Sequence, residues 1–171
     1  IIVSPDTSAL DPAVYRALQE RAHQVGAAFI MDEIKSGFRA RFPCLSTSFG
    51  LDPDIALFSK AIANGFPISV LAGKDALLSD PRIFSMFSTF ASEALSLLSL
   101  RTTLQLLEEG EYERFERASS SLHRALSEQL PRGVRVVGDP TFFKLAFESR
   151  DRALAFAAAL AGEGIVIHPF D

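Results

Sequence analysis

Three short apolar runs, each followed by polar residues, restrict the possible folds of this chain more than any other feature. The runs and the residues after them are Ala27–Met31 before Asp32, Asp54–Phe58 before Ser59 and Lys60, and Ile68–Gly73 before Lys74. Strands that are covered on both faces of an α/β sheet read as continuous apolar stretches of this length. The pattern therefore predicts neighbouring buried strands, with Asp32 and Lys60 at strand ends.

An acid and a lysine at strand ends indicate a particular chemistry. Ligands in open α/β sheets are usually held at the carboxyl ends of the strands. A desolvated lysine loses its proton more readily, and the neutral amine can condense with a carbonyl to form a Schiff base. A carboxylate in the same place could pair with the protonated ring nitrogen of pyridoxal 5'-phosphate (PLP). The pattern alone also allows Asp32 to be a helix cap or ion-pair partner and Lys60 to be a surface lysine.

Two segments carry a resemblance to a known family. DEIKSGFR (residues 32–39) and GLDPDIALFSKAIANGFPISVLAGK (50–74) resemble the class III, fold type I, PLP-dependent aminotransferases, and the glutamate-1-semialdehyde aminomutase branch in particular. The resemblance extends in family order over nearly the whole chain. It implies an α/β fold in which residues 1–110 form the C-terminal portion of the PLP-binding large domain, with a mostly parallel sheet. Residues 111–171 would be a linking helix and part of a small α+β C-terminal domain.

The same resemblance implies roles for four residues. Lys60 would form the Schiff base with PLP, and Asp32 would contact the ring nitrogen. Ile34 would pack on one face of the pyridine ring, although ordinary core packing is an alternative. Thr89 would bind the cofactor phosphate of a neighbouring subunit, unless Thr89 or Ser92 is an ordinary helix cap. The implied protein is a homodimer that transfers amino groups between small-molecule amino and oxo substrates, with no metal ion.

Two other polar residues of the first segment have structural interpretations. We expect Glu33 to make structural hydrogen bonds rather than take part in chemistry. We expect Arg39 to form a fixed ion pair, with contact to a substrate carboxylate as the alternative.

The sequence also departs from the family pattern. Ser4 stands where the family usually has a glutamate before a proline, and the chain begins on strand-like residues without a methionine. The Gly/Ser-rich phosphate loop that the family carries upstream is not in this sequence. We therefore expect a fragment of a longer enzyme. The alternative is a catalytically inactive fragment that retains only the fold and the dimerisation surface.

Helical periodicity predicts the elements around the strands. Asp11 and Pro12 are typical of a helix start, and Val14, Leu18, Ala22 and Val25 would face the sheet. His23 would be solvated. A helix over 92–109 is apolar on nearly all sides and should be buried. A charged helix over 111–130 should expose His123. Strands at 134–137, 142–147 and 165–168 and a helix at 151–161 would complete the chain.

Composition excludes several other classes of function. The net charge of −4 provides no basic surface for nucleic acid, and no apolar run is long enough to span a membrane. The one cysteine, Cys44, cannot form an intrachain disulfide, so we expect a cytoplasmic protein. FIMDE resembles a Walker B strand, but this sequence has no G-x-x-x-x-G-K-[ST] segment, which argues against an ATPase.

Overall fold

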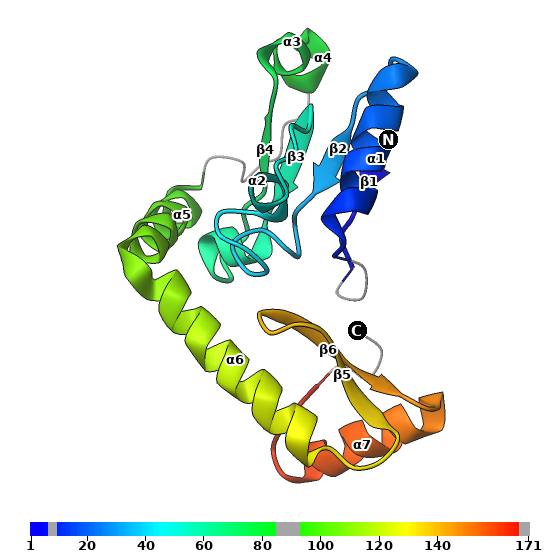
Figure 1. The fold of residues 1–171 in the computed structure, drawn as a ribbon. Coiled ribbons are helices and arrows are strands. Elements are labelled where there is room, and N and C mark those ends of the chain that lie inside the picture. Colours follow the sequence, from blue (N-terminus) through cyan, green and yellow to red (C-terminus); the bar gives the residue numbers. More distant parts are fainter. Residues whose placement is uncertain (7–9, 85–92, 168–171) are drawn as a thin grey trace.

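The computed structural model describes residues 1–6, 10–84 and 93–167 (Figure 1). The strands are β1 (Ile2–Val3), β2 (Ile30–Asp32), β3 (Ile55–Phe58), β4 (Val70–Gly73), β5 (Val134–Asp139) and β6 (Phe142–Phe147). The α-helices are α1 (Pro12–Gln24), α2 (Leu45–Ser48), α3 (Asp75–Leu78), α4 (Pro81–Phe84), α5 (Ala94–Leu106), α6 (Tyr112–Gln129) and α7 (Arg150–Gly162). A 3₁₀ helix, η1 (Lys60–Ala63), and a π-helical turn, η2 (Leu107–Glu111), complete the set.

A four-stranded sheet in the order β1-β2-β3-β4 forms the upper part of the molecule in Figure 1. β1, β2 and β3 are parallel, and β4 pairs with β3 in the antiparallel direction. The predicted α/β fold with a mostly parallel sheet is therefore confirmed. The reversal at β4 has a local reason, because residues 59–69 contain only the short helix η1. A parallel return would need a longer crossover.

Helix α1 begins as the sequence predicts but buries a different face. The Asp11 carboxylate caps the helix by accepting the Ala13 N–H at 2.9 Å. Tyr15 and Ala22 are buried, whereas the predicted core residues Val14, Leu18 and Val25 are exposed. The prediction was correct only for Ala22, because the helix places the stripe of Tyr15 and Ala22 against the sheet.

The core connects the two sheets. Its buried members are Tyr15, Ala22, Phe29, Met31, Ala40, Leu45, Phe49 and Phe142. All of them except Phe142 come from the first 49 residues, and Phe142 comes from the start of β6. The β5–β6 hairpin therefore contributes the ring of Phe142 to this core, and the Thr141 hydroxyl adds a buried hydrogen bond to the Ala40 carbonyl at 3.0 Å.

The expectation that residues 92–109 form a buried helix is wrong for the residues that the structure describes. Leu95, Leu97, Leu98 and Leu106 of α5 are all exposed, and Ser96 is buried. The helix contacts η1, where the Ser99 hydroxyl donates to the Ala63 carbonyl at 2.8 Å. A helix that is apolar on all sides needs partners on all sides, and this chain covers only part of α5.

Helix α6 leads away from the four-stranded sheet toward β5, β6 and α7 (Figure 1). Gly110, with φ of 108°, allows the bend between α5 and α6. The predicted exposure of His123 is wrong, since its ring packs edge-on against Phe143 at 5.4 Å and its Nε2 is buried without a hydrogen-bond partner among the described residues. Residues 165–167 are not a strand, and His168 lies outside the described residues. Within the described ranges, no helix has the length and apolar character needed to cross a membrane.

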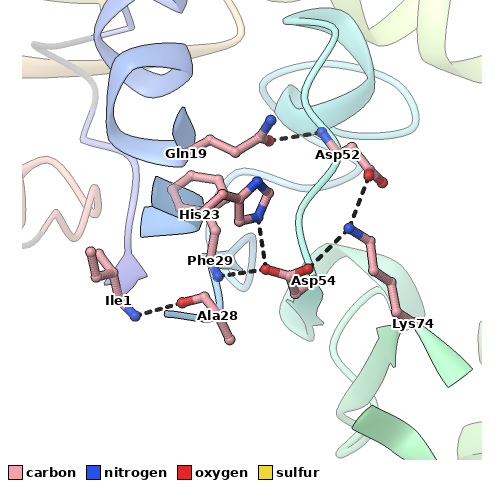
Figure 2. Close-up of polar contacts among 8 residues, drawn as sticks. All are labelled: Ile1, Gln19, His23, Ala28, Phe29, Asp52, Asp54 and Lys74. Atoms are coloured by element: carbon pink, nitrogen blue, oxygen red, sulfur yellow. Dashed lines mark hydrogen bonds and ion pairs between the residues drawn. The ribbon is translucent and has the colours of Figure 1, made fainter. Parts of the chain in front are cut away.

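An ionic network anchors the amino-terminal ends of β2 and β3 (Figure 2). Asp54, only 14% exposed, accepts hydrogen bonds from the Phe29 N–H at 2.8 Å and the Lys74 amine at 2.9 Å, and its carboxylate lies 2.9 Å from His23 Nε2. His23 is thus a hydrogen-bond partner of Asp54 rather than a merely solvated residue. The Phe29 N–H, followed by Lys74 and His23, lowers the pKa of Asp54 to about 2.

We predict that Asp54→Asn lowers the free energy of unfolding at neutral pH by about 1–3 kcal/mol, because it removes a charged acceptor from three donors. The folded-state pKa of Asp54 lies below its ordinary value of 3.8, so its contribution is complete above that value and is lost as pH falls through about 2. Urea unfolding of the full-length protein over this pH range measures both effects.

Asp52→Asn is the matched control. Its side chain is 80% exposed, so the free energy of unfolding should change by less than about 1 kcal/mol. A deficit of Asp54→Asn that stays constant down to pH 2 would contradict the assignment of the Asp54 carboxylate as the anchor.

Candidate functional site

Asp32 and Lys60 lie at the same edge of the sheet. Asp32 is the last residue of β2 and pairs in register with Leu57 of β3. Lys60 begins η1, three residues beyond Leu57. Because β2 and β3 are parallel, their carboxyl ends meet at one edge, where ligands bind in open α/β sheets. Asp32 is partly buried, and its Oδ1 accepts the Ile34 N–H at 3.0 Å.

The backbone at Lys60 has an unusual conformation. Its φ is +50°, in the left-handed region, although residues other than glycine rarely adopt it. The left-handed conformation costs an L-residue roughly 1–2 kcal/mol. Strain of this kind is often found at functional sites. Phe38, with φ of +59°, has the same conformation in the loop that follows β2.

The side chain of Lys60 is exposed, which differs from the apolar surroundings that the sequence implied. It lines a cleft of about 490 Å³ together with Lys35, Arg39, Ser59 and Asn64. Asp32 and Ile34 are not among the residues that line this cleft. The structure thus brings their strands together but does not place all of the predicted site residues around one cavity.

Glu33 fixes the segment that follows β2. Its side chain is fully buried and its carboxylate accepts hydrogen bonds from four donors. These are the Ser36 hydroxyl at 2.7 Å, the Leu45 N–H at 3.2 Å, the Ser46 N–H at 2.7 Å and the Ser46 hydroxyl at 2.7 Å. The predicted structural hydrogen bonding of Glu33 is confirmed. It closes residues 33–46 into a compact loop beside the candidate site.

Gly37 allows this loop to lie close to β3. A Cβ atom there would come within 2.8 Å of the Phe58 ring and 2.9 Å of the Glu33 carbonyl oxygen. Any side chain at residue 37 would therefore push the loop away from the end of β3. The glycine in the sequence GFR thus has a steric explanation.

The predicted ion pair of Arg39 is wrong among the described residues. Its guanidinium instead lies over the buried ring of Phe142, 5.7 Å from the centroid. The ion pair in this loop belongs to Arg41, whose Nη2 lies 2.6 Å from Asp139 Oδ2. Sequence reasoning missed Arg41 because its partner is 98 residues away and no local pattern links them.

A second cleft of about 830 Å³ adjoins the first, because Arg39, Ala61 and Asn64 line both. Its other walls include Phe115 and Leu122 of α6. Sequence reasoning also missed Lys35, whose only signal was its position inside the segment DEIKSGFR.

Two predicted features cannot be placed in the site. Thr89 lies outside the described residues, as does Ser92, its alternative as a helix cap. The cap of α5 is Glu93, whose carboxylate accepts the N–H groups of Leu95 and Ser96. In the described part of the chain, no group of three or more His, Cys, Asp or Glu side chains is arranged to hold a metal ion.

Comparison with known proteins agrees with this arrangement. The model of the family "Aminotransferase class-III" matches residues 7–171. The 2'-deamino-2'-hydroxyneamine transaminase of Streptomyces kanamyceticus is 30% identical over 96% of this chain and 44% of its own length. A glutamate-1-semialdehyde 2,1-aminomutase of an Exiguobacterium species is 32% identical over 65% of this chain and 26% of its own length.

A solved structure shows the same fold. The PLP internal aldimine form of the FumI protein from Sphingopyxis sp. MTA144 superposes with a TM-score of 0.85 at 25% identity. The superposition covers 98% of this chain and 44% of that protein. This chain therefore spans less than half the length of these relatives.

We predict that Glu33→Gln lowers the free energy of unfolding by about 2–4 kcal/mol, because an amide group would face donors that now meet carboxylate oxygens. Urea unfolding of the full-length protein measures the loss. Glu113→Gln, at an exposed residue of α6, should change the free energy by no more than about 0.5 kcal/mol. Equal effects of the two substitutions would contradict the role of Glu33.

Proposed function

This chain belongs to the class III aminotransferase family, and from that membership we propose that its protein carries out PLP-dependent transfer of amino groups. The substrates would be small-molecule amino and oxo compounds. The observation that carries the proposal is Lys60, a lysine with left-handed backbone that follows β3 and lines a cleft at the edge where β2 ends in Asp32. The relatives include both transaminases and aminomutases, and the proposal covers both of these activities.

The residues at this edge fit PLP chemically. The cofactor needs an amine for its aldehyde and an anion for its ring nitrogen, and Lys60 and Asp32 supply one of each. The side chain of Lys60 is accessible to a ligand. Asp32 accepts the Ile34 N–H through Oδ1, and its second oxygen, Oδ2, is the one that we assign to the ring nitrogen. These features support Lys60 as the attachment residue and Asp32 as the partner of the ring nitrogen.

The proposed roles follow from ordinary chemistry. When bound, PLP supplies an electron sink for the carbanion formed at the substrate carbon. Lys60 would hold the cofactor through its ε-amine and would also supply a general base for proton transfer at the substrate carbon. Asp32 keeps the ring nitrogen protonated. Ile34, which is half-buried beside Asp32, packs against one face of the ring.

The assembly is part of the proposal. We propose a homodimer in which Thr89 of each subunit binds the cofactor phosphate of the other. The exposed leucines of α5 support a further packing surface beyond this chain. We also propose that residues 1–110 belong to the cofactor-binding domain, that residues 111–171 belong to the linking helix and small domain, and that the protein acts in the cytoplasm.

A second proposal is that the isolated chain retains the fold and an association surface without activity. The observation that favours it is the exposure of Leu95, Leu97 and Leu98, which this chain leaves uncovered. PLP added to the purified 171-residue chain, followed by borohydride reduction, separates the two proposals. Covalent labelling of Lys60 favours the enzyme, and its absence favours the inactive fragment.

We predict that Lys60→Ala in the full-length protein abolishes the borohydride-stable link to the cofactor, because it removes the ε-amine that the proposal assigns to the cofactor aldehyde. Turnover should fall by at least about 10³-fold, since covalent attachment and proton transfer are both lost. Peptide mass spectrometry and a transaminase assay give the two readouts. Lys144→Ala is the control, and a labelled, active Lys60→Ala protein would disprove the assignment.

We predict that Asp32→Asn retains the covalent link at Lys60 but lowers kcat by about 10²–10³-fold, the size of effect expected when one preorganised charge is removed from a site. The physical reason is that a neutral amide does not hold the ring nitrogen in its protonated form. An unchanged kcat would exclude Asp32 from contact with the ring.

A further inference from the structure

Two residues at this edge of the sheet, Phe38 and Lys60, share a backbone conformation that side chains rarely adopt. Their φ angles are +59° and +50°. A bulky residue with positive φ is an outlier, so surrounding contacts must hold both conformations. The two segments meet at Phe58, the last residue of β3, which comes shortly before Lys60. The ring of Phe38 packs edge-on against the ring of Phe58, with 5.5 Å between the centroids.

The backbone pairing between β2 and β3 ends just before Phe58. The last pair in register is Asp32 with Leu57, and the Glu33 N–H donates to the Leu57 carbonyl at 2.9 Å. Beyond this pair, the loop after β2 contacts β3 at the ring of Phe58. The ring of Phe38 therefore contributes to the path that the chain takes where it leaves β3.

Phe38 is fixed within its own loop. Its N–H donates to the Pro43 carbonyl at 2.9 Å, and its ring makes a second edge-on contact, with Phe42, at 6.3 Å between centroids. The Gly37 N–H next to it donates to the Glu33 carbonyl at 2.8 Å. Closely packed side chains transmit displacements to one another, so a ring fixed in this way restricts the ring that it contacts.

The chain on both sides of Lys60 has polar anchors as well. The Ser59 hydroxyl donates to the Ile68 carbonyl at 2.7 Å, and the Ser99 hydroxyl donates to the Ala63 carbonyl at the end of η1. The side chain of Lys60 itself is exposed. Its direction therefore depends on the backbone that carries it, and not on close packing around the ε-amine.

We propose that Phe38 is a positioning residue, which acts through the ring of Phe58 to hold Lys60 in the orientation needed for proton transfer at the substrate carbon. This inference rests on the proposed function, because it takes Lys60 as the attachment residue and general base. A general base must lie within hydrogen-bond reach of the proton that it moves, so a small displacement of its backbone slows that step. The link to the cofactor depends less on this orientation, because the four-carbon stem of lysine is flexible.

The first test does not depend on turnover. Hydrogen exchange of the full-length protein, with PLP removed, reports on the opening of residues 58–64 and is measured by mass spectrometry. Phe38→Leu should raise the exchange rate there by about 3–10-fold, the range expected when an aromatic pair is lost and an apolar side chain is kept. Phe38→Tyr retains the ring and should exchange as the unchanged protein does. Phe38 lines the cleft of about 830 Å³, which leaves room for the added hydroxyl.

The second test separates positioning from a general structural role. In the PLP-loaded full-length protein, Phe38→Leu should keep the borohydride-stable link and the KM for the amino donor used to assay Lys60→Ala. It should lower kcat by about 10-fold or more, within the 10²-fold that a misplacement of about 1 Å can cost. Phe38→Tyr should restore kcat. Loss of the link, or a raised KM with unchanged kcat, would overturn the inference.

A double-mutant cycle tests the route through Phe58. Phe58→Leu should reproduce the loss of kcat, and its combination with Phe38→Leu should cost little more than either change alone, because both remove the same ring contact. Losses that multiply would show that Phe38 does not act through Phe58 and would overturn the inference. If Phe38→Leu does not fold, Phe58→Leu decides the question, since an unchanged kcat in that variant contradicts the proposal.

Phe147→Leu is the matched control. Phe147 makes a comparable ring contact with Phe156, at 5.4 Å between centroids, and lines neither of the two clefts at the site. It should leave kcat and the exchange of residues 58–64 unchanged, and equal effects of Phe147→Leu and Phe38→Leu would overturn the inference. Hydrogen exchange does not involve the amine of Lys60. A labelled, active Lys60→Ala protein would therefore remove the proposed function without changing the exchange result.

Discussion

The buried carboxylate of Glu33 is the interaction on which the arrangement of the candidate site depends. It lies directly after β2 and accepts hydrogen bonds from Ser36, Leu45 and Ser46. One side chain therefore provides acceptors both for a hydroxyl donor in the turn and for the backbone N–H groups at the start of α2. A carboxylate buried without these donors would be strongly unfavourable. The loop therefore has little freedom to rearrange, and the residues it displays keep fixed positions relative to the end of β3.

The two edges of the four-stranded sheet have different characters. At the amino-terminal ends of β2 and β3, Asp54 forms an ion pair with Lys74 and a hydrogen bond with His23. At the carboxyl ends, Lys35, Arg39 and Lys60 surround a cleft without an acidic partner in its lining. Paired charge stabilises a fold, whereas unpaired charge around a cleft is available to a ligand. This contrast supports the proposal that a ligand binds at the carboxyl ends of β2 and β3.

The sequence predicted the elements whose information is local. The runs before Asp32 and Ser59 became β2 and β3, and the cap at Asp11 formed as expected. Sequence-based prediction failed where contacts between distant segments determine a side chain's position. Arg39, for example, packs on the ring of Phe142, which belongs to the β5–β6 hairpin. The burial expected for α5 failed for another reason, because apolar periodicity indicates that a helix needs partners but not which chain segments provide them. The roles of Ile34 and Thr89 remain predictions.

The left-handed backbone of Lys60 has a consequence for how this position can evolve. Asn64 and Gly65 also have positive φ, and asparagine and glycine tolerate that conformation. Lysine does not tolerate it well. Selection for thermal robustness alone would favour glycine or asparagine at position 60. A lysine at this position is held against its own local preference, so the surrounding structure must offset the cost of that backbone conformation.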